Sequence, residues 1–269
     1  MNYKLAIIFA LNLVIRVNAQ SDLLIAPFRV VFENGKAIEE ITVANTGKDT
    51  ARYTISFLQY KMMTTGKLVK IDIAEDSILF ADKYLRIFPK SVTLAPNESQ
   101  VVRLQLKTPP DLAQGEYRSH LYFRSIVDET PDMGNETDTT KIGFQLIPVY
   151  GISIPVIIRI GQSQVKASAS DVKIVEINGV KQLDCKIERA GNISTFGKIE
   201  IIHTSETGVK TLLGKINGVA VYVPIRSRDI SIPMTIPSTI DIMKGTVVLK
   251  YFVTVDGKEI YYFTQIIQI

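Results

Sequence analysis

Cysteine, histidine and tryptophan are scarce in this 269-residue chain, which contains one cysteine, two histidines and no tryptophan. A single cysteine excludes an intrachain disulfide, so the chain tolerates an oxidising compartment without using it for stability. We interpret Cys185 as a small buried residue of a strand. His120 and His203 fall in different predicted domains, whereas metal sites usually need three or four ligands at characteristic spacings. The sequence therefore predicts no metal site and no cofactor.

Signatures of catalysis and of nucleic-acid binding are also missing. The sequence contains no GxSxG, GxxxxGK(S/T) or GxGxxG motif. The carboxylates of Glu39 and Glu40 are adjacent in sequence, so in an extended chain they face opposite ways. Lysines and arginines are scattered, and the formal net charge is only +4. The sequence therefore predicts a protein that is not an enzyme and does not bind nucleic acid.

The first 19 residues have the pattern of a signal peptide. Lys4 precedes an apolar run over residues 5–14, and residues 17–19, Val-Asn-Ala, resemble a cleavage site. The run is too short for a membrane span, which needs about 20 apolar residues, and no other stretch predicts one. Removing this segment, which holds Lys4 and Arg16, leaves a net charge of +2. We expect an exported chain that starts near residue 20 and does not cross a membrane.

Almost all remaining segments have the period-2 alternation of half-buried strands, as in residues 51–60, ARYTISFLQY. In the second half, pairs of such segments flank hairpin signals at Asn178–Gly179, Asn217–Gly218 and Asp256–Gly257. We predict an all-β fold of two tandem immunoglobulin-like β-sandwich domains. The predicted boundaries are 20–160 and 165–269, with residues 161–164 as the linker.

Local signals in the first half make further predictions. Residues 23–33 form one apolar strand, in which Pro27 marks an edge or a switch between sheets. Asn34 and Gly35 form a hairpin-type turn, and a helical turn follows Ala74. Residues 111–117, DLAQGEY, resemble a tyrosine corner, in which the Tyr117 hydroxyl ties down a loop. A partly buried tyrosine without that bond is the alternative.

Residues 141–160, KIGFQLIPVYGISIPVIIRI, form the most informative stretch. Two prolines would break a transmembrane helix, and no 3.6-residue period indicates an amphipathic helix. Its β-branched and aromatic residues favour a long strand, and proline in a strand indicates an edge or a bulge. Such an apolar edge is either an ordinary sandwich strand that continues into a linker or a strand meant for a partner.

Arg29 is a second unusual feature, because it lies within the otherwise apolar segment LLIAPFRVVF. A buried arginine without a partner is costly. Its side chain therefore either faces a cleft and meets an anion, or lies on the solvent side of an edge strand.

Several motifs, taken in order, resemble the PapD-like periplasmic chaperones of pilus assembly. The resemblance covers about residues 23–160, and the second half is similar only in its strand pattern and length. The motifs are residues 27–32 (PFRVVF), 42–47 (TVANTG), 85–89 and 92–96 (LRIFP and VTLAP), 115–121 (GEYRSHL) and 152–159 (ISIPVIIR).

The resemblance implies a two-domain chaperone with a cleft between its domains. Such a protein lends an edge strand to a pilus or fibre subunit that lacks one, so main-chain bonds supply affinity and side-chain pockets supply selectivity. Arg29 matches the arginine that anchors the subunit's C-terminal carboxylate. The family's second cleft cation, a lysine, is absent here, and Arg159 is a candidate replacement. The donor strand matches residues 144–150, in which Phe144, Leu146, Pro148 and Tyr150 share one face and Ile147 and Val149 the other.

Two functions follow from this pattern. The first is a periplasmic chaperone that binds pilus or surface-fibre subunits through an edge strand, along which residues 141–160 offer unpaired backbone groups. The second is a non-enzymatic structural or adhesive module of the cell envelope without a client. Self-association through the same edge is a further possible contact. A free edge beside a cleft that contains Arg29 would favour the chaperone.

Overall fold

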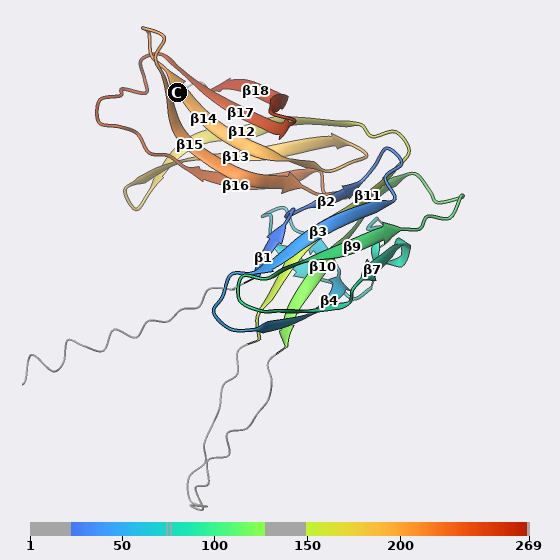
Figure 1. The fold of residues 1–269 in the computed structure, drawn as a ribbon. Coiled ribbons are helices and arrows are strands. Elements are labelled where there is room, and N and C mark those ends of the chain that lie inside the picture. The colour runs from blue at the N-terminus through green and yellow to red at the C-terminus, as the bar shows by residue number, and fades with distance from the viewer. Residues whose placement is uncertain (1–22, 74, 76, 127–148, 268–269) are drawn as a thin grey trace, which may run out of the picture.

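The computed structural model describes residues 23–73, 75, 77–126 and 149–267. The described residues form two β-sandwiches set at an angle, with the N-terminal sandwich below the C-terminal one in Figure 1. This arrangement confirms the all-β fold of two immunoglobulin-like domains. The predicted signal peptide, residues 1–19, lies outside the described residues.

The N-terminal domain packs two sheets around one core. One sheet has the order β1-β3-β9-β7 and the other β2-β11-β10-β4-β8, and β5 and β6 pair separately. Alternate residues of both main sheets point inward, as in β3, where Ile41 and Val43 are fully buried. The strands are β1 (Leu23–Ala26), β2 (Val30–Phe32), β3 (Ile38–Asn45), β4 (Ala51–Leu58), β5 (Tyr60–Met62), β6 (Leu68–Lys70), β7 (Leu85–Phe88), β8 (Ser91–Leu94), β9 (Ser99–Leu106), β10 (Gly115–Ile126) and β11 (Gly151–Ile160).

The C-terminal domain has its own core between two further sheets, ordered β12-β13-β16 and β15-β14-β17-β18. Cys185 is buried in β13, as predicted, and burial raises the pKa of its thiol to about 12. The strands are β12 (Val165–Ile177), β13 (Val180–Gly191), β14 (Thr195–Thr204), β15 (Lys210–Val221), β16 (Ser227–Pro233), β17 (Thr246–Val255) and β18 (Lys258–Ile267). The predicted boundaries of the two domains stay predictions.

The first predicted strand is divided at Pro27. β1 pairs with β3 in one sheet, and β2 pairs with β11 in the other. The expectation of one continuous strand over residues 23–33 was wrong, but the predicted switch between sheets is confirmed. The turn at Asn34 and Gly35 leads from β2 to β3, which belong to different sheets, so it is not a hairpin.

The hairpin signals of the second half had different outcomes. Asn178–Gly179 and Asp256–Gly257 turn two hairpins, and all four residues have positive φ, as type I′ turns require. The signal at Asn217–Gly218 was wrong, because both residues lie inside β15. The segments on either side of it pair with β14, and the register shifts between Gly197 and Ile199 accommodate the dipeptide as an irregularity.

Two local predictions concern Tyr117 and the segment after Ala74. The Tyr117 hydroxyl donates a hydrogen bond of 2.8 Å to the carbonyl of Ala113, which confirms the tyrosine corner. The described helical turn is a 3-10 helix, η1 (Asp82–Tyr84), eight residues beyond Ala74. Residues 74 and 76 themselves lie outside the described part of the chain.

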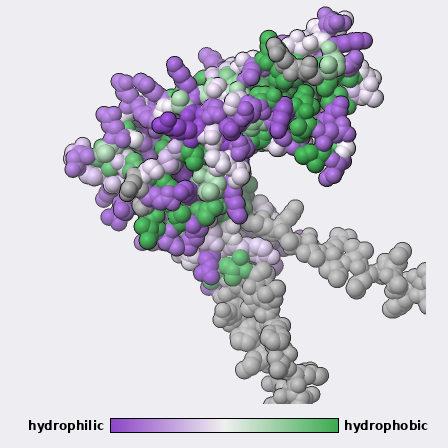
Figure 2. Space-filling view, turned by 180° about the vertical axis from the view of Figure 1, so that it is seen from behind, coloured by the Kyte–Doolittle hydropathy of each residue, from purple (hydrophilic) through white to green (hydrophobic). Residues whose placement is uncertain are grey.

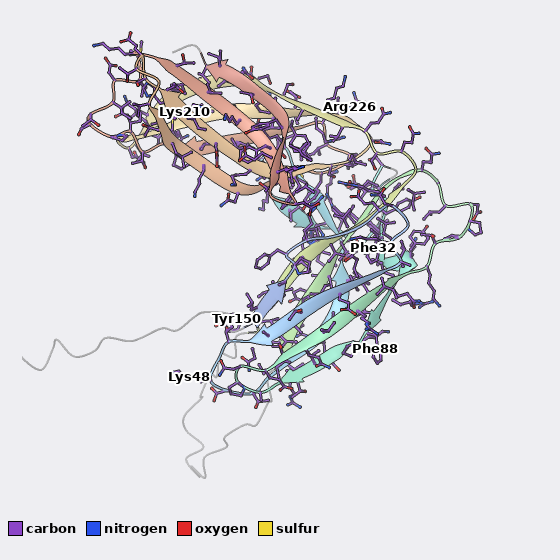
Figure 3. All side chains as sticks on the ribbon, turned by 45° about the horizontal axis from the view of Figure 1, so that its top comes forward. Phe32, Lys48, Phe88, Tyr150, Lys210 and Arg226 are labelled. Atoms are coloured by element: carbon purple, nitrogen blue, oxygen red, sulfur yellow. The ribbon has the colours of Figure 1, made fainter. Side chains whose placement is uncertain are left out.

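An apolar cluster joins the domains. Met62 and Ile157 come from the N-terminal domain, and Ala220 and Tyr222 from the C-terminal domain. The space-filling view shows a concave angle beside this junction, under an overhanging part of the C-terminal domain on which hydrophobic residues gather (Figure 2). In Figure 3, Phe32 lies near the junction, whereas Tyr150 and Lys48 lie at the far end of the N-terminal domain.

Candidate functional site

Among the described strands, β11 has a neighbour along its whole length on one side only. Its antiparallel ladder with β10 joins residues 151–160 to residues 115–124. On the other side, β2 is parallel to it and pairs only with residues 156–158. The expectation of an unpaired edge along all of residues 141–160 was therefore wrong for residues 156–158. Residues 151–155 pair with β10 on one side, and no described residue pairs with their other side, which we call the open edge.

The hydrogen bonds of Tyr150 show which backbone groups point toward that edge. Its carbonyl accepts a bond of 2.9 Å from the amide of Ser125 in β10. The register of the ladder between β10 and β11 therefore continues one residue beyond the pair Arg124 and Gly151. The amide of Arg118 bonds the carbonyl of Leu79 instead of β11. The backbone groups of successive residues in a strand point to opposite sides. Since Tyr150 bonds to β10, the backbone groups of residues 152 and 154 bond to β10 as well. The amides of Gly151 and Ser153 point to the open edge.

The backbone of Pro155, like that of Gly151 and Ser153, faces away from β10. A proline lacks the N–H group, so at an inward position it would remove a bond of the ladder with β10. At residue 155 the missing donor falls on the side away from β10, and that ladder stays complete. The proline that marked this segment in the sequence is thus accommodated because the strand has an edge here.

The predicted donor residues, 144–150, precede β11. Val149 and Tyr150 immediately precede β11, and each is 49% exposed. Their equal exposure favours neither face of the predicted donor strand. Outside the described residues lie Phe144, Leu146, Ile147 and Pro148.

Arg29 immediately precedes β2, and its side chain lies against the C-terminal domain. Its Nη1 donates a hydrogen bond of 3.2 Å to the hydroxyl of Tyr222. The guanidinium carbon lies 4.6 Å from the centre of the Phe196 ring and 5.5 Å from that of Tyr222. Nη2 is buried without a hydrogen-bond partner. Arg29 therefore faces the other domain, with one donor unused.

Arg118 is a second arginine at the same tyrosine. Its guanidinium carbon lies 4.0 Å from the centre of the Tyr222 ring, and its Nη2 donates a bond of 2.9 Å to the carbonyl of Tyr60. Its Nη1, like Nη2 of Arg29, is buried without a partner. The pKa of Arg118 is lowered to about 10, chiefly by burial, with the positive charge of Arg29 acting in the same direction. The two cations share one tyrosine, and among the described residues neither forms an ion pair with a carboxylate.

His120 completes this cluster as a strand residue, as the sequence predicted. Its ring lies edge-on to Tyr60, with 4.9 Å between the ring centres, and edge-on to Tyr222 at 6.5 Å. Burial lowers its pKa to about 3, with the charges of Arg118 and Arg29 acting in the same direction. The imidazole is therefore neutral at ordinary pH and adds no third charge.

Sequence reasoning missed Arg118 as a residue of this site. In β10 both faces are buried over residues 116–121, one against the domain's own core and the other toward the junction. The available signal was the segment YRSH, in which Arg118 and His120 share one face of a strand whose other face buries Tyr117, Leu121 and Phe123.

Arg159, the other predicted binding residue, is already paired. Its Nη1 lies 2.9 Å from the carboxylate of Glu33, and its Nε lies 3.2 Å from that of Glu116. Glu116 also accepts hydrogen bonds from the amide of Ser194, at 3.0 Å, and from the Ser194 hydroxyl. This network connects the two domains beside the linker. The partner-binding role of Arg159 stays a prediction, and its guanidinium is occupied by carboxylates of the chain itself.

No family model matches the chain, and no curated protein matches it. The solved structure of the YadV chaperone is 10% identical, with a TM-score of 0.48, and the match covers 92% of this chain and all of that one. The class 5 fimbriae chaperone CfaA is 18% identical (TM-score 0.43; 91% and 98% covered), and the Pseudomonas aeruginosa CupB2 chaperone 14% (0.44; 90% and 98%).

The chain is similar to PapD-like chaperones over nearly its whole length. The similarity thus extends beyond residues 23–160, where the sequence motifs lie, into the C-terminal domain. At these TM-scores the similarity carries no argument, so the function has to be argued from the residues.

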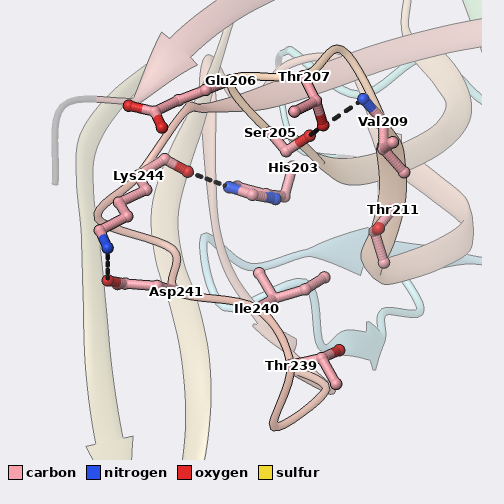
Figure 4. A pocket seen from close by; sticks show the side chains of 10 residues that line it. All are labelled: His203, Ser205, Glu206, Thr207, Val209, Thr211, Thr239, Ile240, Asp241 and Lys244. Atoms are coloured by element: carbon pink, nitrogen blue, oxygen red, sulfur yellow. Dashed lines mark hydrogen bonds and ion pairs between the residues drawn. The ribbon is translucent and has the colours of Figure 1, made fainter.

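A hollow of about 440 Å³ lies in the C-terminal domain (Figure 4). His203 Nε2 lies 2.7 Å from the carbonyl of Lys244, and the Ser205 and Thr207 hydroxyls are 2.8 Å apart. These bonds hold the two loops that form the hollow, and they account for the buried His203 without a ligand. Among the described residues, no three His, Cys, Asp or Glu side chains gather as metal ligands would.

No helix among the described residues has the length and apolar character of a membrane span.

Proposed function

We propose that this protein is an exported, periplasmic, non-enzymatic chaperone that binds subunits of a pilus or surface fibre by adding a strand to them. The observation that carries the proposal is the open edge of β11 over residues 151–155. β2 lies along the same side of β11 at residues 156–158, and Arg29 immediately precedes β2. Free backbone groups at a sheet edge recruit an extended segment, and the ladder formed supplies affinity for many sequences.

The position of β2 favours one direction for the guest strand. β2 runs parallel to β11 and occupies its edge at residues 156–158. A guest that is also parallel to β11 would occupy the edge up to residue 155, with its C-terminal end next to the start of β2. Arg29 is the residue immediately before β2. Only a parallel guest brings its terminal carboxylate to this arginine, whereas an antiparallel guest would bring an amino group.

The charges of the cleft suit such a carboxylate. Arg29 has an unused Nη2, and Arg118, on the other side of the Tyr222 contact, has an unused Nη1. Two like charges with unmet donors in a partly buried site are stabilised when an anion binds, and a guanidinium bonds both carboxylate oxygens. This pair of arginines supports carboxylate anchoring although the expected lysine is absent.

Co-purification from the source organism tests the proposal. The tagged chain is expressed in its native cells, isolated from the exported fraction, and its partners are identified by mass spectrometry. We expect an approximately one-to-one complex with a small β-sandwich subunit whose own sheet lacks a strand. Recovery of the chain alone, or only with copies of itself, would contradict the proposal and favour a structural module of the cell envelope.

A further inference from the structure

A small hairpin of the N-terminal domain contacts the C-terminal domain away from the linker. It consists of β5, β6 and the turn between them, residues 60–70, and belongs to neither sandwich. All of β6 is exposed. A two-stranded hairpin without a sheet to join is marginally stable in water, so contacts elsewhere must hold it in place.

Those contacts lie on β16 and on the junction. The carbonyl of Thr64, in the turn, accepts a hydrogen bond of 2.8 Å from the amide of Asp229. Met62 is buried in the apolar cluster with Ile157, Ala220 and Tyr222. The carbonyl of Tyr60 accepts the bond from Arg118 described above. The hairpin therefore touches both the C-terminal domain and a cation of the cleft.

Gly66 provides the closest fit. A Cβ atom at this position would lie 2.3 Å from Nε and 2.6 Å from Cζ of Arg228, so the guanidinium lies directly on the glycine. Arg228 is fixed there by a bond of 2.8 Å from its Nη1 to the carbonyl of Ala220. Its Nε is buried without a partner. A side chain at residue 66 therefore requires the guanidinium of Arg228 to move away from the turn.

We propose that the hairpin of residues 60–70 is a latch that fixes the angle between the two domains, with Gly66 and Arg228 as its positioning residues. The network of Glu116, Arg159 and Ser194 holds the domains at one place, beside the linker. Arg29, Arg118 and Ile157 contact Tyr222 across the junction. The hairpin adds a further attachment from different elements, which keeps Tyr222 against both Arg29 and Arg118. This inference rests on the proposed function only for its purpose, because the geometry is testable without a client.

The distance between the domains tests the latch. Spin labels are attached at Lys48→Cys and Lys210→Cys, which are exposed and lie in different domains (Figure 3). The native Cys185 is buried, so it does not compete for the label. Distances in the full chain are then measured by pulsed electron resonance. We expect one narrow distribution in the parent and a distribution at least twice as wide in Arg228→Ala and in Gly66→Ala.

Two controls separate the latch from backbone strain. Gly35 has φ +79°, close to the +82° of Gly66, but a Cβ there meets nothing within 4 Å. Gly35→Ala should therefore leave the distribution narrow. In the Arg228→Ala background the clash is gone, so Gly66→Ala should add no further broadening. Parent-like distributions in both single variants would overturn the latch, and this outcome would leave the proposed client binding untouched.

Discussion

At the scale of single residues, the account depends on where a few charged side chains meet aromatic rings. Arg29 could be singled out from the sequence because it interrupts an apolar segment. Its contact with Tyr222 could not, because 193 residues separate the two. Arg118 was missed for the same reason: its neighbours Tyr60 and Tyr222 are distant in sequence. Local pattern identifies an unusual residue, but the partner of that residue depends on how the two domains dock.

Arg29→Ala should reduce recovery of the client at least about ten-fold, which corresponds to the loss of about 1.4 kcal/mol from a charge-assisted bond. The melting temperature should fall by less than about 4 °C, because the side chain contributes one hydrogen bond and a ring contact worth about 1 kcal/mol. Quantitative pull-down and thermal unfolding measure the two effects.

Two further variants serve as controls for Arg29. Arg29→Lys keeps the charge but loses the planar fork, so we expect an intermediate recovery. Arg86→Ala removes an exposed arginine of β7 and should leave recovery at the parent level. Full recovery with Arg29→Ala would contradict the anchoring role.

His120 should make the folded state less stable in acid. The pKa of His120 is lowered from 6.5 to about 3 in the folded chain. Between these values the unfolded chain binds the proton and the folded chain does not, so stability falls as pH falls through this window. The loss should be on the order of 3 kcal/mol between pH 7 and pH 4.

Urea unfolding of the parent and of His120→Gln at both pH values measures this effect. The variant removes the titrating group, so its loss of stability between pH 7 and pH 4 should be smaller by that amount. Charges shared by both proteins cancel in the comparison. An identical pH dependence in the two proteins would show that His120 is protonated without penalty in the folded state.

At the scale of strands and turns, sequence pattern predicted the elements better than their connections. Asp256–Gly257 and Asn217–Gly218 carry the same kind of signal, yet only the first turns a hairpin. The difference is that both segments around Asn217 pair with β14, whereas β17 and β18 pair with each other. Likewise, the apolar character of residues 151–160 predicted a strand. Which part of this strand's edge is open depends on β2, which pairs only with residues 156–158. The sequence pattern does not show this pairing.

The open edge predicts opposite effects of proline at adjacent positions. Ser153→Pro removes an amide that points to the edge, so it should abolish client recovery while costing less than about 1 kcal/mol of stability. Ile152→Pro removes an amide that bonds to β10 and leaves an unmet acceptor, so it should cost at least about 2 kcal/mol. Urea unfolding and pull-down distinguish them.

Ile152→Ala, which shortens the side chain and keeps the amide, isolates the backbone effect of Ile152→Pro. If Ser153→Pro destabilised the fold as strongly as Ile152→Pro, the assigned direction of these backbone groups would be wrong.

At the scale of the whole molecule, the two sandwiches could be predicted from strand pattern, but their junction could not. The junction depends on a buried carboxylate, Glu116, whose side chain is 1% exposed. Its partners come from β11 and from the loop before β14. Such a group stabilises only when all its bonds are made, so the domains have to dock in one arrangement. These residues are far apart in the sequence, and no local pattern indicates that they contact one another in the folded chain.

Arg159→Met should therefore destabilise the chain by about 3 kcal/mol, because it leaves Glu116 buried without its cation. The loss of this network should also weaken the coupling of the domains, so that one calorimetric transition becomes two. Arg103→Met is the matched control. It breaks an ion pair with Glu40 whose side chains are 65% and 52% exposed, and it should cost less than about 1 kcal/mol. Equal effects of the two substitutions would contradict a structural role for the network.

Amide hydrogen exchange along β11, measured for the free protein and for its complex with the co-purified subunit, tests the central claim most directly. We expect the amides of Gly151 and Ser153 to exchange rapidly in the free protein and at least about 100-fold more slowly in the complex. The amides of Ile152 and Ile154, bonded to β10, should be protected in both. Slow exchange at Gly151 and Ser153 in the free protein, or no change on binding, would contradict strand addition at this edge.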